Sequence, residues 1–234
     1  MAMANAVFMV ASKGELVLIR HHKPKGAEIF VNMVFIRYYL SARLIWTCLV
    51  LFDLLERLSS LTRVWFREHP MLAELQPIQL SALMYLARCN RYSNTPLAVT
   101  DYLGLTKGTV SQSLKALEAK GLLTKVQDIR DKRSVHLELT DSARELIGAV
   151  MPPDFLVTAT RQMGSHAADL ETLLLELLRT IQRGQDVPGF GLCHSCRFHQ
   201  VSAQGPFCKL TKEPLSVREV DLICREFKQP EKIA

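Results

Sequence analysis

Four cysteines near the C-terminus have a spacing with which proteins bind metal. Residues 193 to 224 read CHSCRFHQVSAQGPFCKLTKEPLSVREVDLIC, in which the cysteines follow the pattern C-x2-C-x11-C-x15-C. They are Cys193, Cys196, Cys208 and Cys224. Two cysteines separated by two residues can share one metal centre because the backbone between them turns tightly. The other two complete a four-thiolate shell when the chain folds back, so we predict that all four bind metal.

Two kinds of metal centre accept four thiolates, namely structural zinc and an iron-sulfur cluster. Zinc ribbons commonly use two C-x2-C pairs, whereas this segment has one pair and two isolated cysteines. Isolated, widely spaced cysteines are typical of cluster-binding modules. The spacing therefore favours a 4Fe-4S cluster, with zinc as the alternative. His194 and His199 are close enough in sequence to replace one cysteine in a zinc shell.

The cellular compartment decides between metal binding and disulfide formation. The first apolar stretch spans about six residues, whereas the core of a secretory signal has roughly 7 to 15. A longer apolar region, residues 31–52, is interrupted by Arg37 and Arg43, so it falls short of the roughly 18 uncharged residues of a membrane span. We therefore expect a cytoplasmic protein without a membrane partner. In that reducing compartment clustered cysteines bind metal more often than they form disulfides.

Local patterns predict the structure around the cysteines. Ser216 and Glu219 have the spacing of a capping box, which predicts a helix over residues 216–227 with Cys224 near its apolar side. Cys193 and Cys196 are expected on a turn, and Cys208 in a loop. The remaining cysteines, Cys48 and Cys89, stand on apolar faces of predicted helices, where they are expected to be small core residues.

The rest of the chain supplies the elements that must position these residues. The sequence has 234 residues, of which 48% are hydrophobic and 22% charged, which is typical of a folded, helix-rich protein. Residues 28–36 have a strand-like pattern, and leucines at three- and four-residue spacing predict a long helix from about residue 44. Short helices follow Pro77, Pro96 and Thr106, and two alternating segments around residues 122–139 predict a hairpin. Helices are then predicted from Thr140 and over residues 154–183.

This order predicts three parts: an N-terminal extension of unknown role (1–44), a DNA-binding and dimerisation domain (45–183) and a four-cysteine metal-binding tail (184–234). The expected fold is mainly α with a small β-hairpin wing, a winged helix-turn-helix with long dimerisation helices. In such a fold the third helix of the motif enters the major groove of DNA, and the hairpin contacts the backbone. The net charge of +6 also favours a polyanionic partner.

Residues 107–133 carry most of this charge. Seven basic residues oppose three acidic ones between Lys107 and Arg133, a net charge of +4. A helical projection places small and hydrogen-bonding residues on the outer side of the third helix, where they can approach base edges. The predicted DNA-binding residues are Lys107, Gly108, Thr109, Ser111, Gln112, Lys115, Arg130, Lys132 and Arg133.

We predict that the chain is not an enzyme, and no catalytic residues are assigned. The sequence shows no paired carboxylates in a helical frame, no Ser-His-Asp or Cys-His set and no phosphate-binding glycine loop. A DNA-processing enzyme carrying a metal cluster is an alternative. A protein-assembly module is another, although an assembly surface would not need Arg130, Lys132 and Arg133 together at the hairpin tip.

The segment TPLAVTDYLGLTKGTVSQSLKALEAKGLLTKVQDIRDKRSVHLELT resembles the MarR family of bacterial transcriptional regulators. The likeness lies in a helix opened by Thr-Pro, a recognition helix ending in Leu-Glu-x-x-Gly-Leu, a D-x-R-D-x-R wing and a Leu-Thr helix start. It covers about residues 53–183 and is most specific across the wing. Ile129, where the family often has proline, and Ala143, near a frequent glycine, depart from the pattern.

The resemblance implies a homodimer formed by the first helix and the two helices after the wing. Such a dimer would bind double-stranded DNA at a pseudo-palindromic operator with half-sites ~34 Å apart. The family often responds to small-molecule effectors. The expected function is therefore a DNA-binding transcriptional regulator, a repressor, whose cysteine site couples redox or metal state to operator binding. The alternative is a regulator with a purely structural zinc site and a small-molecule effector.

Arg133 at the predicted hairpin tip tests this interpretation. Arg133→Ala removes one charge that is expected to neutralise a DNA phosphate, so it should weaken binding to many sequences and reduce the salt slope of binding by about one. Filter binding or fluorescence anisotropy over a salt series measures both quantities. Unchanged affinity would contradict the assignment of the hairpin to DNA.

Overall fold

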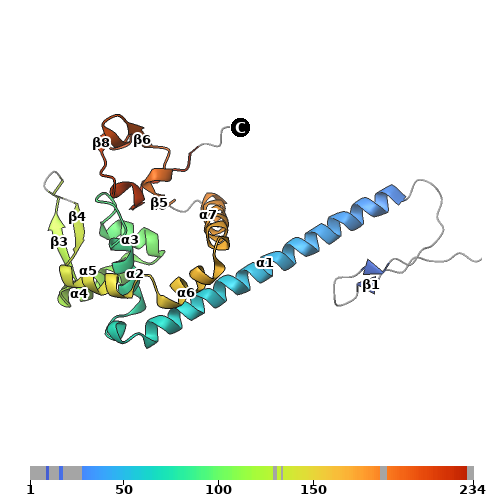
Figure 1. Cartoon of the computed structure of the whole chain (residues 1–234), viewed down its shortest axis with the longest axis horizontal. Helices are drawn as coiled ribbons and strands as arrows, with labels where there is room; N and C mark the ends of the chain where they lie inside the picture. Colours follow the sequence, from blue (N-terminus) through green and yellow to red (C-terminus); the bar gives the residue numbers. More distant parts are fainter. Residues whose placement is uncertain are drawn as a thin grey trace, which may run out of the picture. The chain divides into compact units, whose positions relative to one another are not determined.

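A computed structural model describes residues 9–10, 16–17, 28–128, 131–132, 134–184 and 189–230, with side chains from residue 43. The chain divides into two units, Met1–Val64 and Trp65–Ala234. Figure 1 labels the helices and strands. In the part of the chain that is described, no helix is long and apolar enough to cross a membrane.

The first unit contains a short hairpin and most of one long helix. β1 (Met9–Val10) pairs antiparallel with β2 (Leu16–Val17), and α1 spans Glu28–Glu68. The prediction of a strand-like segment at residues 28–36 is wrong, because these residues form the first turns of α1. No glycine or proline occurs between Gly26 and Pro70, so nothing in the sequence stops the helix from extending past residue 44.

The second unit begins with the winged helix. After the 3-10 turn η1 (Pro70–Leu72) come α2 (Pro77–Leu86), α3 (Pro96–Leu103), α4 (Lys107–Ala119), β3 (Leu123–Gln127) and β4 (Val135–Leu139). The side chains of Thr95 and Thr106 accept hydrogen bonds from the first turns of α3 and α4, as N-caps do. Gly104 ends α3 with a φ of 63°, a conformation that glycine adopts without strain. The predicted mainly helical fold with a hairpin wing is confirmed.

These elements enclose one core. The hairpin strands pair in the register Leu123↔Leu139 and Lys125↔Leu137, which turns the three leucines to the same side. Strand β3 packs on α4, and β4 packs on α2, α3 and α5. The fully buried members of this core include Leu83, Val99, Val110, Leu114, Leu117 and Leu123. Their burial positions α4 with its polar side outward.

Three helices follow the wing: α5 (Asp141–Val150), α6 (Asp154–Met163) and α7 (His166–Gly184). The sequence predicted one continuous helical stretch over residues 154–183. This prediction is wrong, because the stretch is divided into α6 and α7. Gly164 interrupts it with a φ of 56° and a ψ of −128°, far from helical values. The chain therefore makes two helices in place of one.

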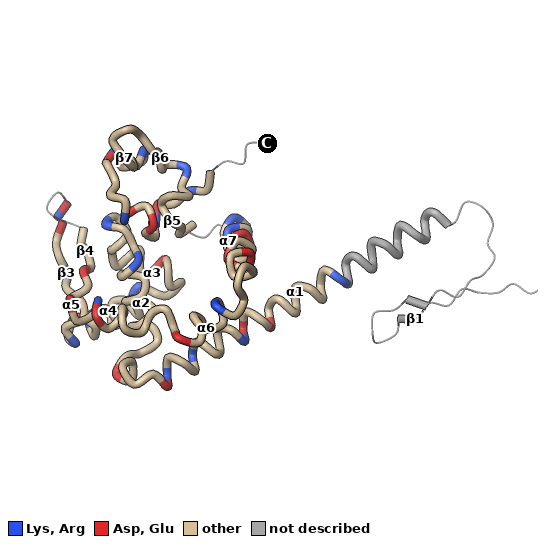
Figure 2. The backbone as a smooth tube through the Cα atoms, viewed as in Figure 1, with Lys and Arg blue, Asp and Glu red and all other residues tan. Residues whose placement is uncertain are grey.

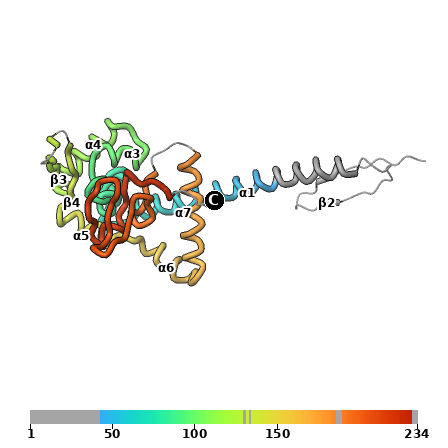
Figure 3. The backbone as a smooth tube through the Cα atoms, turned by 90° about the horizontal axis from the view of Figure 1, so that it is seen from above, coloured from blue at the N-terminus to red at the C-terminus, as the bar shows by residue number. Residues whose placement is uncertain are grey.

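The tail, which we define as residues 189–230, consists of short strands and turns. β5 (Gly191–Leu192) pairs with β9 (Ile223–Cys224), and β6 (His199–Ser202), β7 (Gly205–Cys208) and β8 (Glu213–Pro214) form a three-stranded antiparallel sheet. The 3-10 turns η2 (Cys193–Ser195) and η3 (Glu219–Asp221) lie between them. In Figure 3 the tail, in red, lies over the winged helix and does not extend away from it.

Apolar side chains attach the tail to the winged helix. Ile223 is buried in the same core cluster as Leu83 and Leu117. The ring of Phe190 makes edge contacts with Tyr85 and Tyr102, at centroid distances of 5.9 and 5.1 Å. Phe227 is also buried, and its ring lies directly over Gly191. The tail and the winged helix therefore share apolar packing within one unit.

The shared core predicts the effect of Ile223→Ala. Truncating this buried side chain should lower the free energy of unfolding by about 2 to 5 kcal/mol, as measured by urea or thermal unfolding. The control is Val217→Ala, because Val217 is 76% exposed and its truncation should change stability by less than about 0.5 kcal/mol. Equal effects of the two variants would show that the tail does not share the core.

Candidate functional site

The outer side of α4 carries the predicted base-reading residues. Lys107, Gly108, Ser111, Gln112 and Lys115 are exposed, and Thr109 is partly exposed. On the opposite side of the helix, Val110, Leu114 and Leu117 are buried. The sequence thus placed the polar and apolar sides of α4 correctly. The role of the polar side in DNA binding stays a prediction.

Charge on this surface is partly neutralised by acidic neighbours. The Lys125 ammonium group lies 2.5 Å from the Glu118 carboxylate, and that of Lys120 lies 3.9 Å from Glu74. Figure 2 shows acidic residues among the basic ones in this part of the unit. Lys107 and Lys115 are the exposed cations of α4 itself, and both belong to the predicted DNA-binding set.

The hairpin tip is described only in part. Lys132 is exposed, whereas Arg130 and Arg133 lie outside the described residues. Asp128 accepts a hydrogen bond from the backbone N–H of Asp131 at 2.9 Å, and the Ser134 backbone N–H donates to the carbonyl of Asp131 at 2.8 Å. These bonds form a turn that carries Lys132 at the end of the wing.

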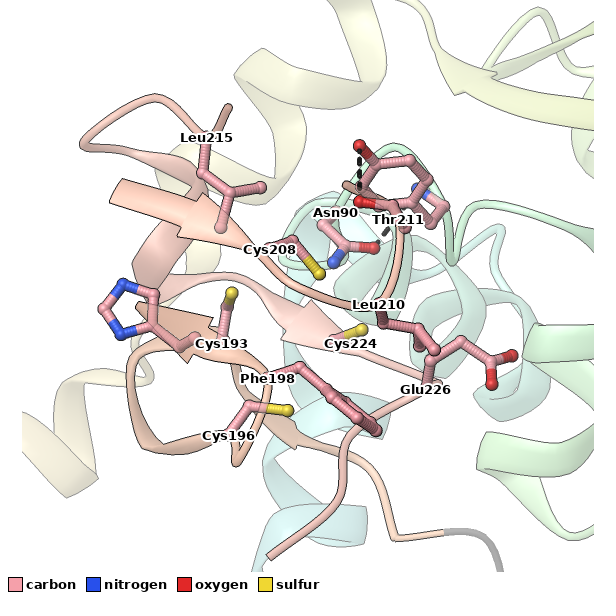
Figure 4. Close-up of a pocket in the computed structure, with 12 residues that line it drawn as sticks. Asn90, Cys193, Cys196, Phe198, Cys208, Leu210, Thr211, Leu215, Cys224 and Glu226 are labelled. Atoms are coloured by element: carbon pink, nitrogen blue, oxygen red, sulfur yellow. Dashed lines mark hydrogen bonds between the residues drawn. The ribbon is translucent and has the colours of Figure 1, made fainter. Parts of the chain in front are cut away.

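The four predicted metal ligands line one pocket. Figure 4 shows the sulfur atoms of Cys193, Cys196, Cys208 and Cys224 turned toward a common space. Cys193 belongs to η2 and Cys196 follows it, while Cys208 ends β7 and Cys224 ends β9. The pocket is completed by apolar side chains, among them Phe198, Leu210 and Leu215. The fold therefore brings together residues that are widely separated in sequence.

Two of the four thiols, those of Cys193 and Cys224, are in an environment that opposes negative charge. Burial raises the pKa of the Cys193 thiol to about 12, and the neighbouring thiols of Cys224, Cys208 and Cys196 contribute to the increase. Burial also raises the pKa of Cys224, and hydrogen bonds from Asn90, from the Glu226 backbone and from Ser93 act against it. A positive charge beside Cys193 and Cys224, such as a bound metal would supply, would favour their thiolate forms.

Two further features of the pocket suit a ligand-binding role. The backbone N–H of Lys228 donates to the Cys196 sulfur at 3.5 Å, a type of bond that stabilises thiolates bound to metal. His199 also lines the pocket, and its Nε2 atom is buried without a hydrogen-bond partner among the described residues. His194, in contrast, is half exposed and lies 3.1 Å from Asp221. Of the two histidines, His199 is the one that lines the thiol pocket.

The predicted helix over residues 216–227 does not form. The capping box itself is present, since the Ser216 N–H donates to Glu219 at 2.7 Å and the Glu219 N–H donates to the Ser216 hydroxyl at 3.3 Å. Only the single turn η3 follows it, and the chain becomes extended at Leu222. The reason is that the N–H and C=O of Ile223 bond to Arg88 and Asn90, which excludes helical hydrogen bonds at this residue.

Other cysteines also differ from the sequence-based expectations. Cys208 is the last residue of a strand and not part of a loop. Cys89 is buried as expected, but it lies after the end of α2 and not on a helix. It forms an isolated β-bridge with Ile223. Cys48 lies on α1 and is exposed, so it is not a core residue of the single chain. The expectation for Cys48 failed because a leucine-rich helix alone does not show which of its sides is covered.

Sequence reasoning missed the residues that the winged helix contributes to this pocket. Asn90 and Tyr92 line it, although both lie in residues 87–95, the linker between α2 and α3. The Tyr92 hydroxyl donates to Glu213 of the tail, and Arg91 forms ion pairs with Glu213 and Glu219 at 3.1 and 2.6 Å. The sequence NRYSN marked only a polar break, and nothing in it indicates a partner about 120 residues away.

Among the described residues, no group of three or more His, Cys, Asp or Glu side chains is close enough to hold a single metal ion. The four sulfur atoms instead surround the pocket from different sides (Figure 4).

Comparison with known proteins relates the chain to one family. The MarR family model matches residues 73–134. The chain is 30% identical over 113 residues to the organic hydroperoxide resistance transcriptional regulator of Bacillus subtilis, covering 47% of this chain and 77% of that protein. It is also 30% identical over 83 residues to the uncharacterized HTH-type transcriptional regulator YwaE of B. subtilis. This match covers 36% of this chain and 48% of that protein.

Solved structures give similar matches. The S. aureus MepR–DNA complex is 22% identical, with a TM-score of 0.46, and covers 55% of this chain and 96% of that one. Apo MarR from E. coli is 21% identical, with a TM-score of 0.43, and the match covers 55% of this chain and 96% of that one. The residues matched by the family model end before the tail.

Members of this family are transcriptional regulators, which confirms the prediction that the chain is not an enzyme. Three observations agree, namely the order of helices, caps and hairpin over residues 77–140, the match to the family model and the similarity to the B. subtilis relative. The chain therefore belongs to the MarR family of winged-helix transcriptional regulators.

Proposed function

We propose that this chain is a homodimeric, DNA-binding repressor whose four-cysteine pocket holds an iron-sulfur cluster, a 4Fe-4S cluster, and couples the state of that cluster to operator binding. The observation that carries the proposal is that four thiols from separate strands and turns line one pocket within the winged-helix unit. A regulator needs an input as well as a DNA-binding surface. The pocket supplies a place for that input.

Family membership and the surface of α4 support DNA binding. The two B. subtilis relatives are named as transcriptional regulators, one of them as HTH-type. Exposed Gln112 can pair with the edge of an adenine base, and exposed Lys115 can neutralise a phosphate. Gly108 and Ser111 are small, which allows the helix to approach the groove closely. Repression follows if the bound dimer occludes a stretch of DNA.

Exposed apolar side chains support a dimer. In the single chain, Leu51, Leu54, Leu58 and Leu61 of α1 are exposed, and so are Leu170, Leu173, Leu174, Leu178 and Ile181 of α7. Stripes of this kind are usually buried against another helix. A two-fold dimer built on these helices would present two recognition helices to a pseudo-palindromic operator.

The spacing of the cysteines supports a cluster over zinc, because this tail has one C-x2-C pair and two isolated cysteines, whereas zinc ribbons commonly use two pairs. A single Zn²⁺ takes four sulfur atoms at about 2.3 Å, so its ligands must converge on one point. A cluster takes one thiolate at each iron, so its ligands surround a larger volume. When bound, a cluster would supply a redox-active, oxygen-sensitive centre. The pocket residues would hold it through four sulfurs, and the apolar Phe198, Leu210 and Leu215 would limit access of water.

Anaerobic purification tests the cluster. The protein should be brown, absorb broadly near 400 nm and contain iron and acid-labile sulfide in a ratio close to one, with about four of each per chain. A colourless protein with stoichiometric zinc would overturn the iron-sulfur assignment and leave a structural zinc site. A protein with neither metal would overturn the metal site altogether.

Cysteine variants assign the ligands. Replacement of Cys193 or Cys224 by serine should abolish the absorption near 400 nm, since each removes one of four ligands. Cys48→Ser is the matched control, because Cys48 is exposed on α1 and distant in sequence from the pocket. It should leave iron content and absorption unchanged. Loss of colour in this variant would show that Cys48 holds the metal.

Gln112→Ala tests the base-reading side of α4. DNA is first selected from a random-sequence pool by the wild-type protein. Loss of one bidentate contact should reduce affinity for the selected sequence by about 1 to 3 kcal/mol and relax preference at one base position. Glu138→Ala is the control, since Glu138 is exposed on β4 outside the predicted contacts. If both variants bind as the wild type does, α4 is not the reading helix.

A further inference from the structure

The linker between α2 and α3, residues 87–95, forms backbone hydrogen bonds to the segment that carries Cys224. The Ile223 N–H donates to the Arg88 carbonyl at 2.8 Å, and the Asn90 N–H donates to the Ile223 carbonyl at 2.9 Å. Cys89 and Ile223 form the parallel bridge between the two segments. The candidate ligand Cys224 is therefore the next residue after a backbone connection to the helix-turn-helix.

Buried side chains continue this connection into the pocket. The Arg225 N–H donates to the Ser93 hydroxyl at 2.9 Å, and that hydroxyl donates to Asn90 Oδ1 at 2.7 Å. Asn90 Oδ1 also accepts from the Tyr92 N–H at 3.2 Å. Its oxygen is therefore engaged by the linker itself, and its amide N–H groups remain for the pocket that Asn90 lines.

Asn90 and Ser93 are buried beside the pocket. They are only 3% and 0% exposed, Asn90 lines the pocket together with Cys224, and Ser93 is bonded to the N–H of Arg225, the residue after Cys224. A buried polar pair of this kind is stable only while its partners stay in place. Its geometry must therefore respond when Cys224 changes from a free thiol to a ligand of a bound group.

An ion pair leads from the same segment to α3. Arg225 contacts Asp101 Oδ2 through Nε at 2.9 Å and through Nη2 at 2.8 Å. Asp101 lies on α3, and α3 is followed by the turn at Gly104 and then by the recognition helix α4. The linker also reaches the wing, because the Leu137 N–H donates to the Asn94 carbonyl at 2.7 Å and His136 Nδ1 lies 2.6 Å from Asn94 Oδ1.

We propose that residues 87–95 sense the occupant of the four-thiol pocket through Asn90 and Ser93, and that the Arg225–Asp101 ion pair transmits its state to α3 and the recognition helix. This inference rests on the proposed function, since it names how that site regulates DNA binding. With the pocket filled, Cys224 and Arg225 are fixed and α3 is held in one orientation. With the pocket empty, this segment is free to shift, and α3 loses the restraint.

This route differs from one through the dimerisation helices. The tail also contacts α7, where Arg179 donates to the Ser195 hydroxyl at 3.0 Å and Gln229 donates to the Arg179 carbonyl at 3.3 Å. A signal through α7 would alter the spacing of the two protomers. The linker route acts within each protomer, on the helix-turn-helix itself.

Hydrogen exchange tests the first step without any DNA. The full-length protein is compared after reconstitution with iron and sulfide and after removal of the metal by a chelator. Amides of residues 87–103 should exchange at least about tenfold more slowly in the reconstituted protein, because opening of the linker must then break the filled pocket. Amides of α5 serve as the internal reference and should change little. Equal exchange of residues 87–103 in both states would overturn the proposal.

Arg225→Gln, Asp101→Asn and the double variant test the second step. The readout is the ratio of affinities of the reconstituted and metal-free proteins for DNA selected by the wild-type protein. A coupled regulator shows a ratio of about 5 to 150, and each variant should reduce it to below about threefold. The double variant should be no worse than either single variant, since all three break one interaction.

Arg218→Gln is the matched control, because Arg218 is an exposed arginine of the same tail. Its substitution removes one positive charge, as Arg225→Gln does. It should keep the wild-type ratio. If the protein takes up no metal, or if the wild-type ratio is one, the proposed function fails. If metal binds and the wild-type ratio is large, but Arg225→Gln leaves it unchanged, the proposed function stands and the linker route is wrong.

Discussion

The two backbone hydrogen bonds of Ile223 anchor the tail to the winged helix. They fix residue 223 in an extended conformation against the linker, and its side chain enters the winged-helix core. Because the chain is anchored there, Cys224 faces the pocket and Arg225 reaches Asp101. β9 also becomes the partner of β5, which starts the turn that carries Cys193. The thiol pocket and the winged helix are thus parts of one packed unit.

The pocket carries a conflict between its packing and its chemistry. Burial stabilises the tail through Ile223, Phe227 and Leu215, yet burial also raises the pKa of Cys193 and Cys224 and disfavours thiolates. Hydrogen bonds from Asn90 and Ser93 relieve part of this cost at Cys224. A cation among the four sulfurs, as the proposed function requires, would relieve the rest and would thereby stabilise the tail.

Local signals predicted the winged helix well. Thr95, Pro96 and Thr106 act through contacts within a few residues, so they place the starts of α3 and α4 from sequence alone. The four cysteines were also recognisable as a set, because their residue type and spacing are specific. The elements that failed depend on distant partners. The Ser216–Glu219 capping box forms, but the pairing of Ile223 with the linker prevents the helix that the box predicts.

The same reason explains why the linker residues beside the thiol pocket were missed. Asn90 and Ser93 are ordinary polar residues of a loop, and only the folded chain brings them to Cys224. The prediction of one helix over residues 154–183 rested on the leucines after residue 169, and Gly164 before them ends α6. The strand-like residues 28–36 became helical because a neighbouring helix extended into them. Tertiary contacts and helix continuity therefore overrode local propensity at these places.

The contact between Gly191 and Phe227 has an evolutionary consequence. A Cβ atom at position 191 would lie 2.8 Å from three atoms of the Phe227 ring, which is closer than carbon atoms can pack. The ring is buried and the strand is held on its other side by β9, so neither can move away easily. Across relatives that possess the tail, positions 191 and 227 should therefore vary together, with a side chain at the first tolerated only where the second is smaller than phenylalanine.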